Sequence, residues 1–355
     1  MRVLLVTSWG TACGIAAHSA ALKESVERAD AGIEVIPLPD ALDPGAQTIL
    51  KGEYPPVVGF DMGRGRPAVF GDLVHLNHHD ALHSRWTPDH VSRLVVQGLP
   101  VLVTYHDTRS GAPDAPNSEK LKALAQVASS VVVHEPVADL RAIYWRQGVP
   151  AAATRPAVYY STVRGEWVDG RGSAWATPWK AFPQQPVLGS VGFAFPWKNY
   201  DRLAQVTSEE GWALVLLAND ATAVDEARWR ASNPSILVVR KFLPQAEVTN
   251  YLAGCDLTAF MYECSNNGTS GAIRQGIAAR KPVVALAGCR QFRDLLEMET
   301  GIFWVKDWDG FRQVLRHTDP APWDARISTL AWQESWERAG QNYSKLYHTL
   351  VGDRT

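Results

Sequence analysis

Residues 262–285 read Y-E-C-S-N-N-G-T-S-G-A-I-R-Q-G-I-A-A-R-K-P-V-V-A, and they indicate how this chain folds. The apolar run 257–261 precedes them and predicts a strand. A loop of small polar residues follows, then a helix-forming segment over 272–279, and Pro282 opens a second short strand. A strand, a loop, a helix and a strand in this order form one unit of an α/β fold.

The loop of this unit has features that suit a phosphate. Ser270 is placed to cap the helix, and we expect the backbone amides of Thr269, Ser270 and Gly271 to be unpaired at its start. Unpaired amides at a helix N-terminus attract anions. Small polar residues also fill ordinary β–α turns, so the loop alone fits either interpretation.

The composition is that of a globular protein, and it limits the classes of function. A chain of 355 residues is long enough for two domains with a core each. Lys and Arg number 35 against 37 Asp and Glu, a net charge of -2, which argues against a surface built mainly for polyanions. Several of the 14 Trp residues stand in polar surroundings, where they could stack on sugars or bases or pack between domains.

Cysteine spacing and hydropathy indicate a cytoplasmic protein. The four cysteines show no C-x-x-C spacing, so we expect reduced thiols and neither a disulfide framework nor a zinc site. The start, M-R-V-L-L-V-T, reads as a first strand and not as a signal peptide. No run approaches the ~18 apolar residues of a membrane span, so no transmembrane segment is expected.

The first half alternates predicted strands and helices, and 39–67 looks loop-like. The strands are expected at 2–7, 33–37, 73–76, 100–104 and 130–134, and the helices at 15–29, 121–128 and 137–147. The first β–α turn lacks the G-x-G-x-x-G fingerprint, because Gly10 and Gly14 have no third glycine, and this argues against a nicotinamide dehydrogenase. Gly14 either lets a ligand approach the backbone or merely opens the helix.

Polar residues follow two of these strands. Asn77 and His78 come after one strand, and His106 comes directly after another. Open α/β sheets bind ligands at the carboxyl ends of their strands, so these residues are placed to line a substrate site. His78 and the adjacent His79 would point apart, and no partner set completes a metal site. His106 would equally fit a histidine that is hydrogen-bonded within a loop.

A second β/α series follows residues 164–185, a stretch of Gly, Pro and aromatic residues without periodicity that predicts an interdomain linker. The strands are expected at 187–191, 212–217, 236–239, 257–261, 282–286 and 302–305, and the helices at 200–208, 223–231, 245–253, 271–280 and 310–316. Apolar residues at three- and four-residue spacing predict one amphipathic helix over 331–350.

Two such domains with a terminal helix resemble the GT-B fold of nucleotide-sugar glycosyltransferases. More narrowly, the chain is similar to family-four retaining glycosyltransferases along most of its length. Five motifs carry this resemblance in the family's order: C-G-I-A-A-H-S-A-A-L (13–22), V-T-Y-H-D-T (103–108), G-F-A-F-P-W-K (192–198), the segment 243–256 that opens with L-P and ends in D, and R-K-P-V-V (280–284).

The resemblance implies an α/β protein of two Rossmann-like domains that face a cleft. Residues 1–165 would form the N-terminal acceptor-side domain, 166–185 the linker and 186–330 the nucleotide-sugar domain. Residues 331–355 would form a helix that crosses back and packs on the N-terminal domain.

The donor motif departs from the family pattern. The two glutamates of the family's E-x7-E motif align with Asn267 and Gln275, and its phosphate-binding Arg aligns with Phe193. An amide can hydrogen-bond sugar hydroxyls but carries no charge. Glu263 could supply a carboxylate instead if the loop is longer than usual. Tyr262, followed by G-T-S-G (268–271), resembles a variant of divergent members.

The resemblance implies transfer of a sugar from a UDP- or GDP-sugar to an acceptor hydroxyl, with retention and without a metal or another cofactor. Lys198 would stabilise the departing diphosphate, and His106 would hydrogen-bond or polarise the sugar. The implied donor-binding residues are Gly14, Tyr262, Glu263, Asn267, Gly268, Thr269, Ser270, Gly271 and Ala272. The acceptor is open between a glycan, a lipid and a small molecule.

Other functions stay open. One is the same chemistry on a hydroxylated DNA base, as in phage-type glycosyltransferases, which the Trp-rich linker favours and the net charge of -2 opposes. Another is a non-catalytic GT-B protein that binds a nucleotide or scaffolds a partner, which the loss of both glutamates and the Arg favours. A GT-B epimerase is the weakest alternative, since its carboxylate pattern is absent.

Overall fold

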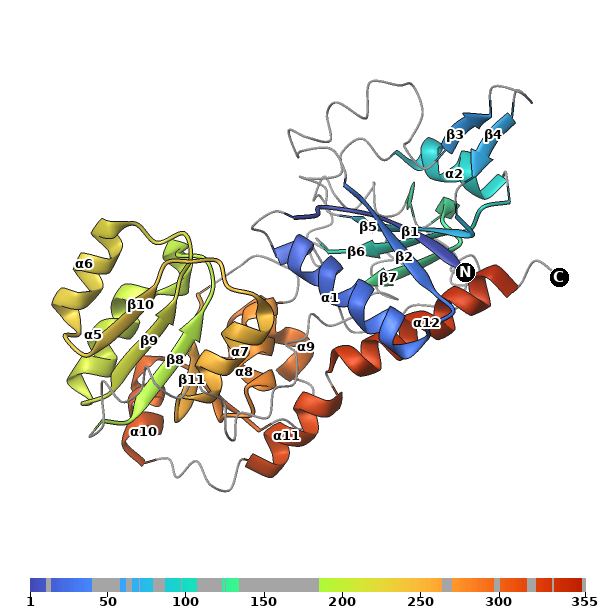
Figure 1. The fold of residues 1–355 in the computed structure, drawn as a ribbon. Helices are drawn as coiled ribbons and strands as arrows, with labels where there is room; N and C mark the ends of the chain where they lie inside the picture. Colours follow the sequence, from blue (N-terminus) through green and yellow to red (C-terminus); the bar gives the residue numbers. More distant parts are fainter. Residues whose placement is uncertain are drawn as a thin grey trace. The chain divides into compact units, whose positions relative to one another are not determined.

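A computed structural model describes most of the two sheets and their helices. The described residues are 1–10, 14–39, 58–61, 66–69, 71–78, 87–96, 98–106, 123–124, 126–133, 185–263, 270–296, 301–317, 324–333 and 335–352. They form two compact units: the described residues up to 133 and from Trp336 onward belong to unit 1, and those from 185 to Ser335 belong to unit 2. We treat each unit by itself (Figure 1).

Unit 1 is built on a parallel sheet of five strands in the order β2-β1-β5-β6-β7. The sheet strands and helices of unit 1 are β1 Arg2–Thr7, α1 Gly14–Ala29, β2 Glu34–Pro39, β5 Leu73–His78, α2 Pro88–Val96, β6 Val101–Tyr105, β7 Ser130–Val133 and α12 Trp336–Gly352. Because β1 pairs with β2 on one side and β5 on the other, the strand order reverses at β1. A ligand site in such a sheet is expected at this switch point.

The first strand is buried on both faces, which explains its uninterrupted apolar sequence. Val3 and Leu5 pack in the core that α1 and α12 cover. Leu4 and Val6 point to the opposite core, which includes residues of α2. A strand with both faces covered by helices carries no alternation of apolar and polar residues.

The C-terminal helix α12 packs on unit 1, as the resemblance implied. Its apolar face contributes Trp336, Ala339 and Tyr343 to the core beside α1. At Gly340 the two helices approach closely, since an added Cβ would lie 2.2 Å from the carbonyl oxygen of Ser25 in α1. Figure 1 shows α12, in red, beside α1.

Three predictions about unit 1 and the C-terminus were wrong. The single helix predicted over 331–350 is two helices, α11 Asp324–Gln333 in unit 2 and α12 in unit 1. Trp332, expected on the apolar face, is 42% exposed in α11. The segment 39–67, expected to be loop-like, contains β3 Val58–Asp61, which pairs with β4 Arg66–Val69 as an antiparallel hairpin. The helix α2 was not predicted.

Unit 2 is a parallel sheet of six strands in the order β10-β9-β8-β11-β12-β13. Its elements are β8 Val187–Val191, η3 Pro196–Lys198, α5 Tyr200–Glu209, β9 Ala213–Leu217, α6 Ala223–Ser232, β10 Ile236–Val239, α7 Gln245–Ala253, β11 Leu257–Phe260, α8 Gly271–Ala278, β12 Val283–Leu286, η4 Arg290–Phe292, α9 Arg293–Leu296, β13 Ile302–Val305, α10 Trp308–His317 and α11. Numbered within the unit, the order is 3-2-1-4-5-6, that of the Rossmann fold, with its switch point between β8 and β11.

The strands and helices predicted for unit 2 agree with the structure to within a few residues. The helix predicted at 137–147 and the linker predicted at 166–185 lie outside the described residues, apart from Gln185. Cys255 is a buried free thiol. Cys289 is disulfide-bonded, so the expectation of four reduced thiols was wrong for that residue.

A buried chain of hydrogen bonds joins α12 to the sheet of unit 1. His75 of β5 bonds through Nδ1 to the Tyr347 hydroxyl and through Nε2 to Thr104 Oγ1, both at 2.7 Å. Thr104 Oγ1 in turn lies 3.0 Å from the Tyr343 hydroxyl. Burial, together with the nearby His18, lowers the pKa of His75 to about 3, so the ring is neutral in the folded protein.

This buried histidine predicts that acid destabilises unit 1. The unfolded chain takes up a proton at His75 near pH 6.5, whereas the folded unit does so only near pH 3. The free energy of unfolding therefore falls as pH drops between these values, by about 1.4 kcal/mol per pH unit for this residue. The measurement is urea unfolding at pH 7 and pH 5, with hydrogen exchange of α12 peptides as the readout. The variant His75→Gln should lose about 2 kcal/mol less than the wild type across this interval, and identical losses would contradict the prediction.

Candidate functional site

The switch point of unit 2 holds a buried lysine. The strands β8 and β11 are parallel neighbours, so the segments that follow them begin at the same edge of the sheet. Lys198 lies at the end of η3 after β8, and Tyr262 lies two residues after β11. The Lys198 Nζ is 4.8 Å from the ring centroid of Tyr262 and 5.4 Å from that of Trp197. The ammonium therefore lies against two aromatic faces where this fold class binds ligands.

The charge of Lys198 is poorly compensated by the protein. Burial lowers the pKa of its amine to about 7, and the carboxylate of Asp220 opposes this shift only in part. Within the part of the chain that the structure describes, no carboxylate forms an ion pair with Lys198. An anion bound beside the amine would raise its pKa and restore the full charge.

Gly192 makes room for this amine. An added Cβ at Gly192 would lie 1.9 Å from Lys198 Nζ and 3.3 Å from the Tyr200 hydroxyl. Its φ of +137° is a conformation that other residues rarely adopt. The motif 192–198 predicted a role for Lys198. The contact between Gly192 and the amine was not predicted.

Tyr262 supports the amine with its ring, while its hydroxyl is engaged by the backbone. The hydroxyl donates to the Val191 carbonyl at 2.7 Å, at the end of β8. The rings of Trp197 and Phe292 pack on Tyr262, each at 5.5 Å between centroids. The contact that Tyr262 makes in the predicted site is therefore the one to Lys198.

Glu263 places an exposed carboxylate at the same edge of the sheet. Its backbone amide donates to the Trp197 carbonyl at 2.8 Å, and its Oε1 accepts from Trp308 Nε1 at 3.3 Å. The guanidinium of Arg202 lies 4.8 Å from the centroid of the Trp308 ring. Trp308 therefore holds one oxygen of the carboxylate, which can also accept hydrogen bonds from ligand hydroxyls.

The start of α8 agrees with the prediction in part. Ser270 is the N-cap residue, but its side chain makes no capping hydrogen bond. Its amide donates to the Gln291 carbonyl at 3.2 Å, so the expectation of an unpaired amide at Ser270 was wrong. No described residue accepts a hydrogen bond from the amides of Gly271 and Ala272, which begin the helix.

Three predicted donor residues, Asn267, Gly268 and Thr269, lie outside the described residues. Gln275, which aligns with the second glutamate of the family motif, is buried in α8. Its Oε1 accepts from Thr249 Oγ1 of α7 at 3.2 Å. In the structure this amide therefore joins two helices.

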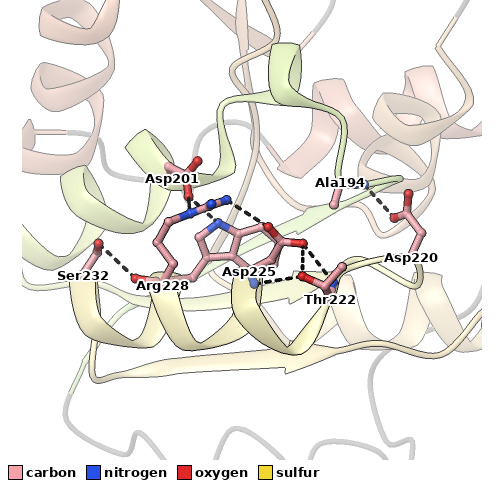
Figure 2. A network of polar contacts seen from close by, with 8 residues as sticks. Ala194, Asp201, Asp220, Thr222, Asp225, Arg228 and Ser232 are labelled. Atoms are coloured by element: carbon pink, nitrogen blue, oxygen red, sulfur yellow. Dashed lines mark hydrogen bonds and ion pairs between the residues drawn. The ribbon is translucent and has the colours of Figure 1, made fainter.

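Asp220 fixes the loop that follows Gly192. Figure 2 shows its carboxylate accepting from the amide of Ala194, at 2.7 Å. The same view shows that other polar residues serve α6: Thr222 and Asp225 form a capping box, and Arg228 bridges Asp225 to Asp201. Asp220 was missed from sequence because its partner lies 26 residues away.

The sequence-predicted residues of unit 1 lie at the carboxyl edge of its sheet. Gly14 is exposed at the start of α1, and an added Cβ there would meet no atom within 4 Å. His106 follows β6 directly and is half-buried. Its Nε2 is hydrogen-bonded to Asn77 Oδ1, and its ring lies edge-on to His18 at 4.7 Å. Asn77 was expected to line a substrate site, whereas His18 and Ser19 were not predicted as site residues.

The described residues lack both a metal-binding cluster and a membrane-spanning helix. They contain no group of three His, Cys, Asp or Glu side chains that could hold a metal ion. Nor do they include a helix with the length and apolar character needed to cross a membrane.

Comparison with known proteins adds structural relatives only. No protein-family model and no curated protein matches the sequence. The crystal structure of Anabaena Alr3699/HepE in complex with UDP is similar at a TM-score of 0.62 and 14% identity, over 98% of this chain and 100% of that one. Alpha,alpha-trehalose 6-phosphate synthase from Burkholderia multivorans is similar at 0.57 and 12% identity, over 80% of this chain and 73% of that one. The N-terminal domain of Candida albicans trehalose-6-phosphate phosphatase gives 0.62 and 10%, over 100% and 97%.

These similarities establish the fold. Two Rossmann-like sheets in one chain, with full-length similarity to HepE, show the GT-B fold predicted from the sequence motifs.

We predict that the absence of a side chain at Gly192 keeps the pKa of Lys198 low. In Gly192→Ala the new Cβ expels the amine into water, and the pKa of Lys198 rises from about 7 toward its ordinary value of 10.5. Titration of lysine Cε chemical shifts by NMR measures this pKa. Gly211→Ala is the control, because Gly211 also has a positive φ but has open space around its Cβ. A wild-type Lys198 that titrates at its ordinary value would refute the prediction.

Proposed function

We propose that this protein is a glycosyltransferase that moves a sugar from a nucleotide diphosphate sugar to an acceptor hydroxyl. The observation that carries the proposal is Lys198, a buried amine at the switch point of a Rossmann sheet without a carboxylate partner among the described residues. A diphosphate is a dianion that would compensate this charge. The UDP and UDP-glucose named for the HepE crystal structures support the choice of ligand.

Lys198 would act on the leaving group. As the bond between the anomeric carbon and the diphosphate breaks, negative charge develops on the diphosphate, and a fixed cation stabilises it. The amides of Gly271 and Ala272 would donate to the same phosphates from the N-terminus of α8. Asn267, Gly268 and Thr269 are proposed to complete this loop around the donor.

The carboxylate of Glu263 would accept hydrogen bonds from hydroxyls of the donor. It is the exposed acidic group beside Tyr262, and Trp308 Nε1 already holds one of its oxygens at 3.3 Å. Gly14 and His106 would serve the donor from unit 1, Gly14 at a phosphate and His106 at the sugar. Both lie at the carboxyl edge of their sheet, where α/β folds bind ligands.

Retention and independence of metals are the finer parts of the proposal, and they rest on the resemblance to family-four glycosyltransferases. The leaving phosphate oxygen would take the proton of the acceptor hydroxyl, so no separate general base is required. A UDP- or GDP-sugar is the proposed donor, and a glycan, a lipid or a small molecule is the proposed acceptor. NMR of the anomeric product tests retention, and chelation with EDTA tests the need for a metal.

The proposed location is the cytoplasm. The disulfide at Cys289 argues against it, because such bonds are rare in reducing compartments. Mass spectrometry of protein taken directly from cells would show whether Cys289 is a free thiol, as expected in the cytoplasm, or disulfide-bonded.

The first test removes the charge of Lys198. In Lys198→Ala the rate of sugar transfer, or of donor hydrolysis, should fall about 100- to 1,000-fold, since one stabilising group for the developing charge is lost. Lys345→Ala removes an exposed lysine from α12 and should leave the rate unchanged. Wild-type rates in Lys198→Ala would exclude Lys198 from the mechanism. Binding of UDP-glucose without turnover in the wild type would favour the non-catalytic alternative.

The second test uses the low pKa of Lys198. UDP-glucose keeps a constant charge between pH 6 and 8, so a change of its affinity in this range reports on the protein. Because the free amine titrates at about 7 and the bound one higher, affinity should be greatest below pH 7. Above that it should fall by up to about tenfold per pH unit. Calorimetry at several pH values measures this, and Lys198→Ala should remove the dependence. A wild-type affinity that is flat across the range would contradict it.

A further inference from the structure

Five polar side chains form one hydrogen-bonded group at the carboxyl edge of the unit 1 sheet. We call this group the Asn77 cluster: Thr7, His18, Ser19, Asn77 and His106. All but His106 are fully buried. Thr7 Oγ1 lies 2.5 Å from Ser19 Oγ, and Asn77 Nδ2 lies 2.6 Å from Ser19 Oγ and 3.3 Å from His18 Nδ1. His106 Nε2 is hydrogen-bonded to Asn77 Oδ1.

The direction of these hydrogen bonds is set by a backbone carbonyl. Ser19 Oγ lies 2.8 Å from the carbonyl oxygen of Ile15, one turn earlier in α1. A carbonyl only accepts, so the single proton of the Ser19 hydroxyl points to it. Thr7 and Asn77 must then donate to Ser19. Asn77 therefore turns its nitrogen toward Ser19 and its oxygen toward His106.

His18 supports the same orientation of the amide. Its ring is fully buried, and burial lowers its pKa to about 3, so it is neutral at physiological pH. A neutral ring can accept at Nδ1 the second proton of the Asn77 amide. With the amide reversed, its oxygen would face the Ser19 hydroxyl. Ser19 could then donate to that oxygen only by giving up its hydrogen bond to the Ile15 carbonyl.

We propose that Asn77 is a positioning residue that holds the uncharged form of the His106 ring in the tautomer with its proton on Nε2. The Asn77 oxygen is an acceptor, so Nε2 donates to it, and a neutral imidazole has only this one proton. Nδ1 then carries a lone pair.

The chemical meaning of this tautomer rests on the proposed function. A sugar hydroxyl that meets Nδ1 of His106 donates its proton and does not receive one. Of the two roles that the sequence left open for His106, this selects a hydrogen-bond acceptor for the sugar. In metal sites, the hydrogen-bond partner that orients a ligating side chain is worth about 10- to 100-fold in activity, and we expect a similar factor here.

The test is NMR of the full-length protein with ¹⁵N-labelled histidine. Long-range ¹H–¹⁵N correlations distinguish the two tautomers, and the His106→Gln variant assigns the signals of His106 among the 10 histidines. We expect the Nε2–H pattern at neutral pH. A pattern with the proton on Nδ1 would overturn the proposal.

Two variants show whether the cluster sets the tautomer. Asn77→Ala removes the acceptor, and Ser19→Ala removes the group that orients the amide; in each we expect a mixture of tautomers at His106. Ser25→Ala is the matched control, since Ser25 is buried in α1 and donates to the Leu22 carbonyl at 2.9 Å, outside the cluster. It should leave the wild-type pattern. An unchanged His106 pattern in Ser19→Ala or in folded Asn77→Ala would overturn the role of Asn77.

Activity gives an independent readout. With UDP-glucose as donor, kcat in Asn77→Ala should fall about 10- to 100-fold with little change in KM, as expected for an orienting residue. A protein that lacks transferase activity would refute the proposed function and leave the NMR result standing. An active protein with the wrong tautomer would refute the role of Asn77 alone.

Discussion

The burial of the Lys198 ammonium is the constraint on which the candidate site of unit 2 depends. Removing a charge from water is costly unless other charges or dipoles replace the water. Here the ring faces of Tyr262 and Trp197 replace it in part, and the position of Gly192 permits no side chain. Asp220 holds the adjoining loop and supplies a remote negative charge. The positive charge that the described residues leave uncompensated can attract an anionic ligand. The burial of the amine therefore leaves the site preorganised for binding an anion.

The two units use the same architecture for different chemistry. Each has a parallel sheet whose strand order reverses, at β1 in one and between β8 and β11 in the other. The edge of unit 2 presents a cation that the protein compensates poorly. The edge of unit 1 instead holds a largely buried set of hydrogen bonds around Asn77. The edge of unit 2 is suited to binding charge, and the edge of unit 1 is suited to fixing the positions of protons.

Features of the fold and site that depend on neighbouring residues in the sequence were predicted, and features that depend on distant contacts were not. The strands β1 and β9 were predictable because strands buried on both faces have uninterrupted apolar sequences. Lys198 and His106 were found from motifs at strand ends. The amide of Ser270 was mispredicted because its partner, Gln291, belongs to a later turn, and Gly192 acquires its role only from a folded neighbour. The break between α11 and α12 escaped notice because apolar residues continue at helical spacing across it. The predictions for Asn267, Gly268 and Thr269 stay predictions.

The helix α12 packs on unit 1 although it follows unit 2 in the sequence. This arrangement affects the order in which the two units can fold during synthesis. The described residues of unit 2 all lie between 185 and Ser335, after the strands of unit 1 and before α12 in the sequence. Unit 1 obtains Tyr343 and Tyr347, and with them the hydrogen bonds of His75 and Thr104, only after α12 has left the ribosome. Domains that emerge first usually fold first. In this chain the N-terminal unit must wait with part of its core uncovered, and the unit synthesised second is the first that can be complete.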